Sequence, residues 1–280
     1  FLASFAGKEL MVQLSYYHAF SGALSRFRRD GVVLHFAEMH GWERALNARV
    51  DEYPSMRSVG FQHTIVPLLL LNYFQGGRDC GPQPDFLACA GEIPHQLFLK
   101  DGWPPEKVFV LGAFRFQGLG EILQARGQRE PAKKKQIVVA LSIDESENEE
   151  ILRLLYDAFR AGGENVRVLL KDHPHTPVRE TLRKMKLRLD PEIFSITADP
   201  LPKLMQESRA MIVKESSSVL YALAAGIPVI VPMLYGMVDL CPLSGLSGIA
   251  WYVRDAGELS KAVIRAMEQE RGTQSDESLR

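Results

Sequence analysis

The stretch Ala210–Val231, AMIVKESSSVLYALAAGIPVIV, decides the fold class of this chain. It begins with a short apolar run, Ala210–Val213, which leads through three serines into a helical segment, Val219–Ala225. A Gly-Ile-Pro sequence ends that helix, and Val229–Val231 follows as a second buried run. Short apolar strands that alternate with helices of this length are typical of a parallel α/β sheet.

A matching stretch lies upstream, where Val166–Leu170 (VRVLL) predicts another buried strand. Ligands of open parallel sheets bind outside the carboxyl ends of the strands. A helix N-terminus with free N–H groups and serine hydroxyls also suits a phosphate. We therefore expect a site for a phosphorylated, nucleotide-bearing ligand. Its predicted residues are Lys171, His173 and Pro174 after the first strand, and Glu215, Ser216, Ser217 and Ser218 after the second.

The same alternation over 280 residues predicts two α/β domains. We assign residues 1–117 to an N-terminal domain, residues 118–135 to a linker, residues 136–270 to a C-terminal domain and residues 271–280 to a polar tail. Because the chain begins at Phe1 without Met, we expect the N-terminal domain to lack its first part. The predicted strands are Val32–Phe36, Ser58–Phe61, Phe86–Cys89, Val108–Leu111, Gln136–Leu141, Val166–Leu170, Ile193–Ile196, Ala210–Val213 and Val229–Val231.

Three further features of this organisation are expectations. The linker carries a lysine cluster, which suits either a solvated surface or an anionic membrane face. The acidic segment Asp144–Glu150 is expected to precede a helix over Ile151–Arg160. The last helix, Glu258–Gln269, is expected to cross back to the N-terminal domain.

Composition excludes several classes of protein. Lys+Arg 33 against Asp+Glu 34 argues against a nucleic-acid-binding protein, whose domain is normally basic. The three cysteines show neither metal-ligand spacing nor an even disulfide set, which favours a reducing cytoplasm. No apolar run has the length of a membrane span. Without an Asp-x-Asp motif, a GxGxxG motif or a Walker loop, neither a metal nor a cofactor is expected.

At these motifs the chain resembles GT-B glycosyltransferases, and more narrowly bacterial enzymes that use CMP-activated acidic sugars. His173-Pro174 and Ser216-Ser217 match, in order and strand context, the His-Pro and Ser-Ser/Thr motifs of bacterial sialyltransferases and capsule Kdo transferases. The resemblance implies two Rossmann-like domains whose parallel sheets face a central cleft. It also implies that His173 contacts the nucleotide phosphate and stabilises the leaving group. The paired acidic-acidic-Gly motif of sialyltransferases is absent from this sequence.

The N-terminal half carries a second resemblance. Glu38–Glu43 (EMHGWE) and Gly60–Thr64 (GFQHT) resemble elements of surface-carbohydrate biosynthesis proteins. Glu38, at a strand end, is the predicted general base, or the nucleophile of a retaining reaction. His63 is the alternative base or an acceptor contact, whereas Glu43 is expected to be structural. Two further residues are predicted to contact the acceptor or an anion: His40 and Arg115.

The resemblance implies a glycosyltransferase of capsule or lipopolysaccharide assembly. It would transfer a nonulosonic acid or Kdo from a CMP-activated donor to a glycan or glycolipid, in the cytoplasm or at the inner membrane face. Three alternatives stay open. The chain could be a UDP-sugar-using GT-B enzyme or epimerase, a CDP-glycerol glycerophosphotransferase, or a non-catalytic GT-B module that binds a glycan or a partner enzyme.

Overall fold

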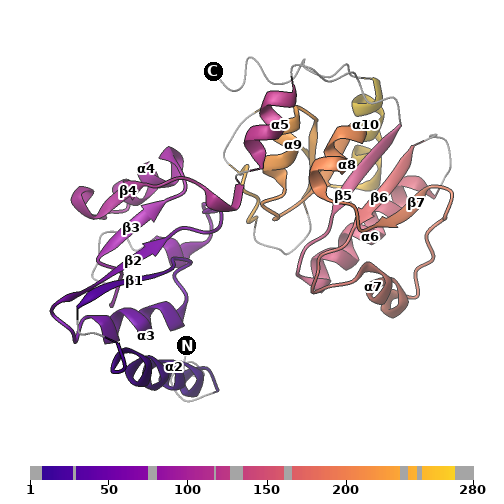
Figure 1. Cartoon of the computed structure of the whole chain (residues 1–280). Helices are drawn as coiled ribbons and strands as arrows, with labels where there is room; N and C mark the ends of the chain where they lie inside the picture. Colours follow the sequence, from indigo (N-terminus) through magenta and orange to yellow (C-terminus); the bar gives the residue numbers. More distant parts are fainter. Residues whose placement is uncertain are drawn as a thin grey trace. The chain divides into compact units, whose positions relative to one another are not determined.

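The computed structural model describes residues 8–27, 30–74, 81–116, 118–126, 135–160, 166–233, 239–244 and 248–268. The chain divides into two compact units (Figure 1). Unit 1 comprises residues 1–66 and 70–117, and unit 2 comprises residues 67–69 and 118–280. Each unit contains one sheet in which every strand pair is parallel.

Unit 1 is built on a sheet of order β1-β2-β3-β4. Its strands are β1 (Gly31–Phe36), β2 (Met56–Phe61), β3 (Phe86–Cys89) and β4 (Val108–Val110). Its helices are α2 (Lys8–Leu24), α3 (Gly41–Val50) and α4 (Glu92–Lys100), with short 3₁₀ turns η1 (Leu71–Tyr73), η2 (Pro105–Lys107) and η3 (Phe114–Phe116). Because each strand pairs with the next one along the chain, right-handed crossovers place α3 and α4 on the same face of the sheet.

The two faces of this sheet differ in burial. On the helix-covered face, Leu87 and Cys89 are fully buried and pack with Phe98 of α4. On the opposite face Val32 and Leu34 of β1 are 62% and 68% exposed. Within the described residues, the core of unit 1 therefore lies on one side of its sheet.

Unit 2 has a sheet of order β10-β9-β8-β5-β6-β7. Its strands are β5 (Gln136–Ala140), β6 (Arg167–Lys171), β7 (Phe194–Thr197), β8 (Ala210–Val213), β9 (Val229–Pro232) and β10 (Ala250–Val253). Its helices are α5 (Leu119–Arg126), α6 (Glu145–Phe159), α7 (Val178–Met185), α8 (Leu201–Glu207), α9 (Val219–Ala225) and α10 (Ala256–Glu268). The first strand, β5, lies between the second and the fourth, so the strand order reverses between β5 and β8. Such a reversal is the switch point of a doubly wound fold.

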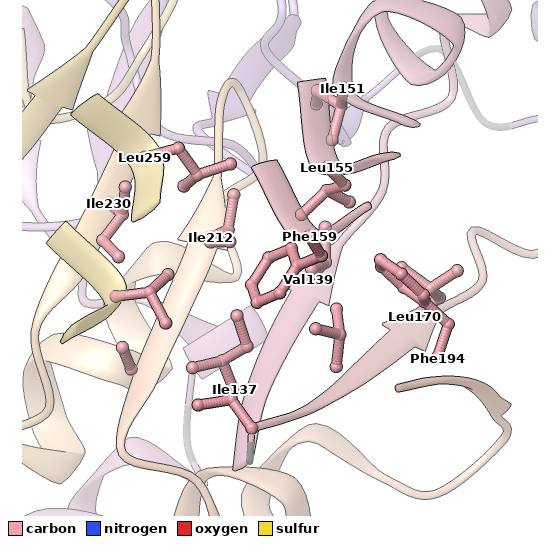
Figure 2. Packing of buried hydrophobic residues seen from close by; sticks show 14 of the residues in the cluster. Ile137, Val139, Ile151, Leu155, Phe159, Leu170, Phe194, Ile212, Ile230 and Leu259 are labelled. Atoms are coloured by element: carbon pink, nitrogen blue, oxygen red, sulfur yellow. The ribbon is translucent and has the colours of Figure 1, made fainter. Parts of the chain in front are cut away.

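Helices cover both faces of the unit 2 sheet, and β5 is buried along its whole length. Ile137 and Val139 point to one face, where they pack with Leu155 of α6 and Leu259 of α10 (Figure 2). Val138 and Ala140 belong to the core on the opposite face. This arrangement explains why β5 is an uninterrupted apolar run, as is usual for strands of a covered parallel sheet.

All the predicted strands form, but three expectations about the other elements are wrong and one strand was missed. The first half of the predicted linker is helix α5, because Ile122 is only 3% exposed and packs in the core beside α9. The acidic segment is the first half of α6, which begins at Glu145 after the N-cap Asp144. Strand β10 was not predicted. Helix α10 does not cross back but packs on α6 within unit 2. The lysine cluster lies mainly outside the described residues.

Truncation of the unit 2 core should unfold that unit selectively. We expect Leu155→Ala to lower its free energy of unfolding by about 2–5 kcal/mol, because Leu155 is fully buried between α6 and the sheet. The neighbouring variant Tyr156→Ala is the control, since Tyr156 is 36% exposed. Urea unfolding followed by circular dichroism measures both, and equal losses in the two variants would contradict this packing.

Candidate functional site

The predicted phosphate-site residues lie at one edge of the unit 2 sheet. His173 and Pro174 follow β6, and Ser216–Ser218 follow β8, so both segments stand at carboxyl ends of parallel strands. One strand, β5, lies between β6 and β8. Because neighbouring strands are about 4.8 Å apart, the two loops begin roughly 10 Å from each other. The structure thus brings the two predicted motifs to the switch-point edge, where doubly wound folds bind ligands.

The loop after β6 holds His173 through its own backbone. The Thr176 N–H donates to the His173 carbonyl at 3.1 Å, and the Thr176 hydroxyl donates to the carbonyl of Ile143 in the loop after β5 at 2.7 Å. Asp172 accepts a hydrogen bond from the Val178 N–H at 2.8 Å and so secures the start of α7. These contacts tie the His-Pro loop both to its helix and to the neighbouring loop.

The imidazole of His173 has a defined tautomer. The His175 N–H donates to His173 Nδ1 at 3.3 Å, so the neutral ring carries its proton on Nε2. Burial, followed by the nearby His175 ring, lowers the pKa of His173 below its usual value. At neutral pH His173 is therefore an uncharged donor through Nε2–H, suited to a hydrogen bond with a phosphate oxygen.

The serine loop differs from the predicted helix mouth. The N–H groups of Val219, Leu220 and Tyr221 donate to the carbonyls three residues earlier, at 3.0–3.2 Å, and are not free. Ser216 Oγ accepts from the Ser218 N–H at 3.2 Å, and Ser218 is only 7% exposed. The hydroxyls of Ser216 and Ser217, which are partly exposed, are available to a ligand.

The two predicted charged contacts in this site already have partners. Lys171 Nζ donates to the Ala198 carbonyl at 3.2 Å. Glu215 accepts a hydrogen bond at 2.7 Å from Lys214, whose side chain is 3% exposed. Lys214 was not singled out in the sequence because it follows an apolar strand without any motif of its own. The Lys214–Glu215 ion pair at the end of β8 thus belongs to the structural surroundings of the site.

A second residue missed in the sequence is Glu147, in the first turn of α6. It is 1% exposed, and neither carboxyl oxygen has a hydrogen-bond partner within 3.5 Å among the described residues. Burial, followed by the charge of Glu215, raises the pKa of Glu147 to about 7, and Lys214 and the Ser142 side chain oppose this shift only in part. Within the acidic segment Glu147 resembled its solvated neighbours, so only its three-dimensional position distinguishes it.

The raised pKa of Glu147 makes the stability of unit 2 depend on pH. The folded state holds a proton that the unfolded chain, with an ordinary pKa of 4.5, releases, so stability falls as pH rises from 4.5 to about 7. We expect Glu147→Gln to stabilise unit 2 by up to about 3 kcal/mol at pH 8 and by little at pH 4.5. Thermal unfolding at both pH values measures this, and equal effects at the two would argue against a buried titrating carboxyl.

In unit 1, the loop after β1 is organised by Glu43. Its carboxylate accepts the N–H of Glu38 at 3.0 Å and that of Met39 at 2.8 Å, and it is 2% exposed. Met39 has a φ of 59°, a left-handed conformation that is strained for a side chain of this kind. Burial is the larger influence on the pKa of Glu43 and raises it against these backbone donors. Glu43 is structural, as the sequence indicated.

This loop presents Glu38 and His40 as a pair. His40 Nε2 lies 3.3 Å from Glu38 Oε2, and the two side chains are 54% and 25% exposed. The Glu38 carbonyl accepts a hydrogen bond from Asn72 Nδ2 at 2.9 Å, which fixes the backbone on that side. The predicted base is therefore a partly exposed carboxylate with an imidazole beside it.

The other predicted residues of unit 1 lie at increasing distances from this pair. His63 follows the adjacent strand β2 and its ring lies 4.5 Å from that of Phe36, at the end of β1. Arg115 lies in η3 after β4, three strands from β1, and is exposed. The structure therefore groups Glu38, His40 and His63 but does not bring Arg115 to them.

Loss of the Glu43 carboxylate should destabilise unit 1. In Glu43→Leu the N–H groups of Glu38 and Met39 lose a charged acceptor, and we expect a loss of about 2–4 kcal/mol. The exposed Glu92 at the start of α4 offers a matched control, Glu92→Leu. Chemical unfolding followed by tryptophan fluorescence compares the two, and a Glu43 variant as stable as the control would contradict this role.

The described part of the chain contains neither a metal cluster nor a membrane-spanning helix. No group of three or more His, Cys, Asp or Glu side chains there could hold a metal ion. No helix in those same ranges is both long and apolar enough to cross a membrane.

Comparison with solved structures identifies the fold. A UDP-GlcNAc 2-epimerase from Methanocaldococcus jannaschii, in complex with UDP-GlcNAc and UDP, matches 93% of this chain and 75% of its own at 14% identity and a TM-score of 0.56. A putative UDP-N-acetylglucosamine 2-epimerase from Listeria monocytogenes matches 92% and 71% at 14% identity and a TM-score of 0.58. The glycotransferase of kitacinnamycin matches 93% and 73% at 14% identity and a TM-score of 0.57. No family model matches the chain, and no curated protein matches it in sequence.

At 14% identity these matches establish the fold. The chain has the GT-B class of architecture, with two Rossmann-like α/β units, as predicted. Nothing in the comparisons supports the narrower resemblance to CMP-dependent acidic-sugar transferases. Both epimerases among these matches are named for UDP-GlcNAc, in line with one of the alternatives left open by the sequence.

Proposed function

We propose that this protein is a GT-B enzyme that binds a UDP-activated sugar through unit 2. The observation that carries the proposal is the position of His173, Ser216 and Ser217 at the switch-point edge of a doubly wound sheet. The proposal is supported by the shared fold of a protein solved with UDP-GlcNAc and UDP. UDP-sugar transfer acts at the sugar carbon that carries the diphosphate and 2-epimerisation at the neighbouring carbon, so both fit such a site.

The charges around the site favour binding by neutral donors. Asp172 and Glu215 are acidic, Lys171 is engaged by a backbone carbonyl, and Lys214 is paired with Glu215. The uncharged His173 Nε2–H and two serine hydroxyls are left to meet the diphosphate. When a glycosidic bond to phosphate breaks, negative charge develops on that phosphate, and a preorganised donor stabilises it.

The acid–base group of the reaction belongs to unit 1 in this proposal. Glu38 is partly exposed and its loop is fixed by Glu43 and Asn72. A carboxylate held in this way suits removal of a proton from an acceptor hydroxyl or from a sugar carbon. His40, beside it, and His63, on the next strand, are the polar neighbours that would orient either substrate.

A second candidate keeps the CMP-activated donor. The observation that favours it is the His-Pro and Ser-Ser pair, which follows β6 and β8 of one sheet with only β5 between them. Calorimetric titration with UDP, CDP and CMP separates the candidates. Tightest binding of UDP supports the main proposal, tightest binding of CMP supports the second, and binding of none of the three leaves neither standing.

Donor-site variants test the roles within unit 2. We expect Ser217→Ala to weaken UDP binding by about 1–2 kcal/mol, through loss of a hydrogen bond to a charged group. His173→Ala should lower turnover by about a hundredfold, because it removes the positioned donor at the leaving phosphate. The control is His175→Ala, at an exposed ring beside it. Unchanged UDP affinity in a His173→Ala/Ser217→Ala double variant would remove the donor from this loop pair.

Glu38→Gln tests the chemistry while leaving unit 2 untouched. We expect UDP affinity to stay as in the wild type and turnover to be lost, since Gln cannot accept the proton. Incubation with UDP-GlcNAc followed by proton NMR distinguishes the reactions. New signals from a second UDP-sugar indicate epimerisation, whereas release of UDP only when an acceptor glycan is added indicates transfer. Wild-type turnover in the Gln variant would assign the base to another residue.

A further inference from the structure

The buried carboxyl of Glu147 is not explained by helix capping. Asp144, the N-cap of α6, accepts the Glu147 N–H at 2.9 Å, as in a capping box. The reciprocal bond is absent, because the Asp144 N–H donates to Ser142 Oγ at 3.1 Å instead. The Glu147 side chain, at 1% exposure, is turned away from solvent with two oxygens that have no hydrogen-bond partner within 3.5 Å among the described residues.

The groups around Glu147 connect it to the serine loop. Glu215 and Lys214, at the end of β8, act on it electrostatically, as does Asp144 in its own loop. Lys214 and Glu215 also act electrostatically on the Cys241 thiol. The ammonium of Lys214 is thus shared among several acidic groups, and it is already bonded to Glu215. An anion bound at Ser216 and Ser217 would add negative charge next to this cluster.

We propose that Glu147 is a proton-binding residue linked to occupancy of the anion site at Ser216 and Ser217. Binding of the anion draws one proton from solvent onto the Glu147 carboxylate, giving the neutral acid, and release of the anion returns that proton. The inference rests on the proposed function, because it requires an anionic ligand at these serines. Its consequence is a nucleotide affinity that declines as the solution becomes alkaline.

The physical basis is the cost of a buried charge. Burial outweighs the two influences that favour the ionised form of Glu147, which are the charge of Lys214 and a hydrogen bond from the Ser142 side chain, so a small added negative potential favours the neutral form. Because the pKa of Glu147 is raised to about 7, its change of protonation occurs near neutral pH. Asn148 beside it is held by reciprocal bonds with the Ser142 backbone at 2.8 and 2.9 Å, so the first turn of α6 is fixed and protonation is the simpler response.

Calorimetry with UDP measures the linked proton directly. Titrations at pH 7.5 in two buffers of different ionisation enthalpy should show uptake of a fraction of a proton by the wild type. Affinity should then fall by up to about tenfold per pH unit above neutrality. In Glu147→Gln and in Glu147→Leu we expect no proton uptake and a flatter dependence of affinity on pH. Glu150→Gln, a partly exposed carboxylate later in the same helix, should retain the uptake.

Each result that contradicts the inference shows whether the proposed function fails with it. Proton uptake that persists in both Glu147 variants would assign the proton to another group, with His173 the first candidate, and would overturn the inference. UDP binding by the wild type without proton uptake would overturn it as well and would leave the proposed function standing. Failure of both UDP and inorganic phosphate to bind would overturn the inference together with the proposed function.

Discussion

Strand β5 is the constraint on which unit 2 depends. It pairs in parallel with β6 on one side and β8 on the other, and all five of its residues are buried. A strand in this position needs apolar side chains toward both helical layers, which the sequence QIVVA supplies. The same pairing directs the loops after β5, β6 and β8 to one edge. The candidate site is therefore a consequence of how the core is packed.

The polar groups at that edge follow from its closeness to the core. A side chain at this edge, such as His173 two residues beyond β6 or Glu147 in the first turn of α6, is partly or fully removed from water, which disfavours its charged form. Burial therefore lowers the pKa of His173 and raises that of Glu147. Lys214, at 2% exposure, donates a hydrogen bond to Glu215 at 2.7 Å. Charge is thus paired or suppressed at the edge, and hydrogen-bond donors remain.

The sequence predicted what depends on local pattern. Buried strands such as Ala210–Val213 and the helix Val219–Ala225 have the predicted bounds, because apolar runs and the Gly-Ile-Pro stop act locally. Helix α5 was missed because its burial depends on packing against α9, which is remote in sequence. Glu147 was missed for a similar reason, since its burial depends on the folded unit and its raised pKa depends in part on Glu215, which is remote in sequence. The prediction of free N–H groups at the start of α9 was wrong, because the first N–H groups of that helix donate to carbonyls three residues earlier.

In unit 1 a buried glutamate, Glu43, has a different role. Its loop after β1 contains a left-handed Met39, and the strain is held by two hydrogen bonds to the buried Glu43 carboxylate. Those bonds fix the backbone of Glu38 while leaving its side chain partly exposed beside His40. In unit 2 a buried carboxyl lacks such donors and becomes sensitive to protons, whereas in unit 1 a buried carboxylate has them and serves as an anchor. The number of backbone N–H groups within reach, rather than the residue type, decides which role a buried glutamate takes.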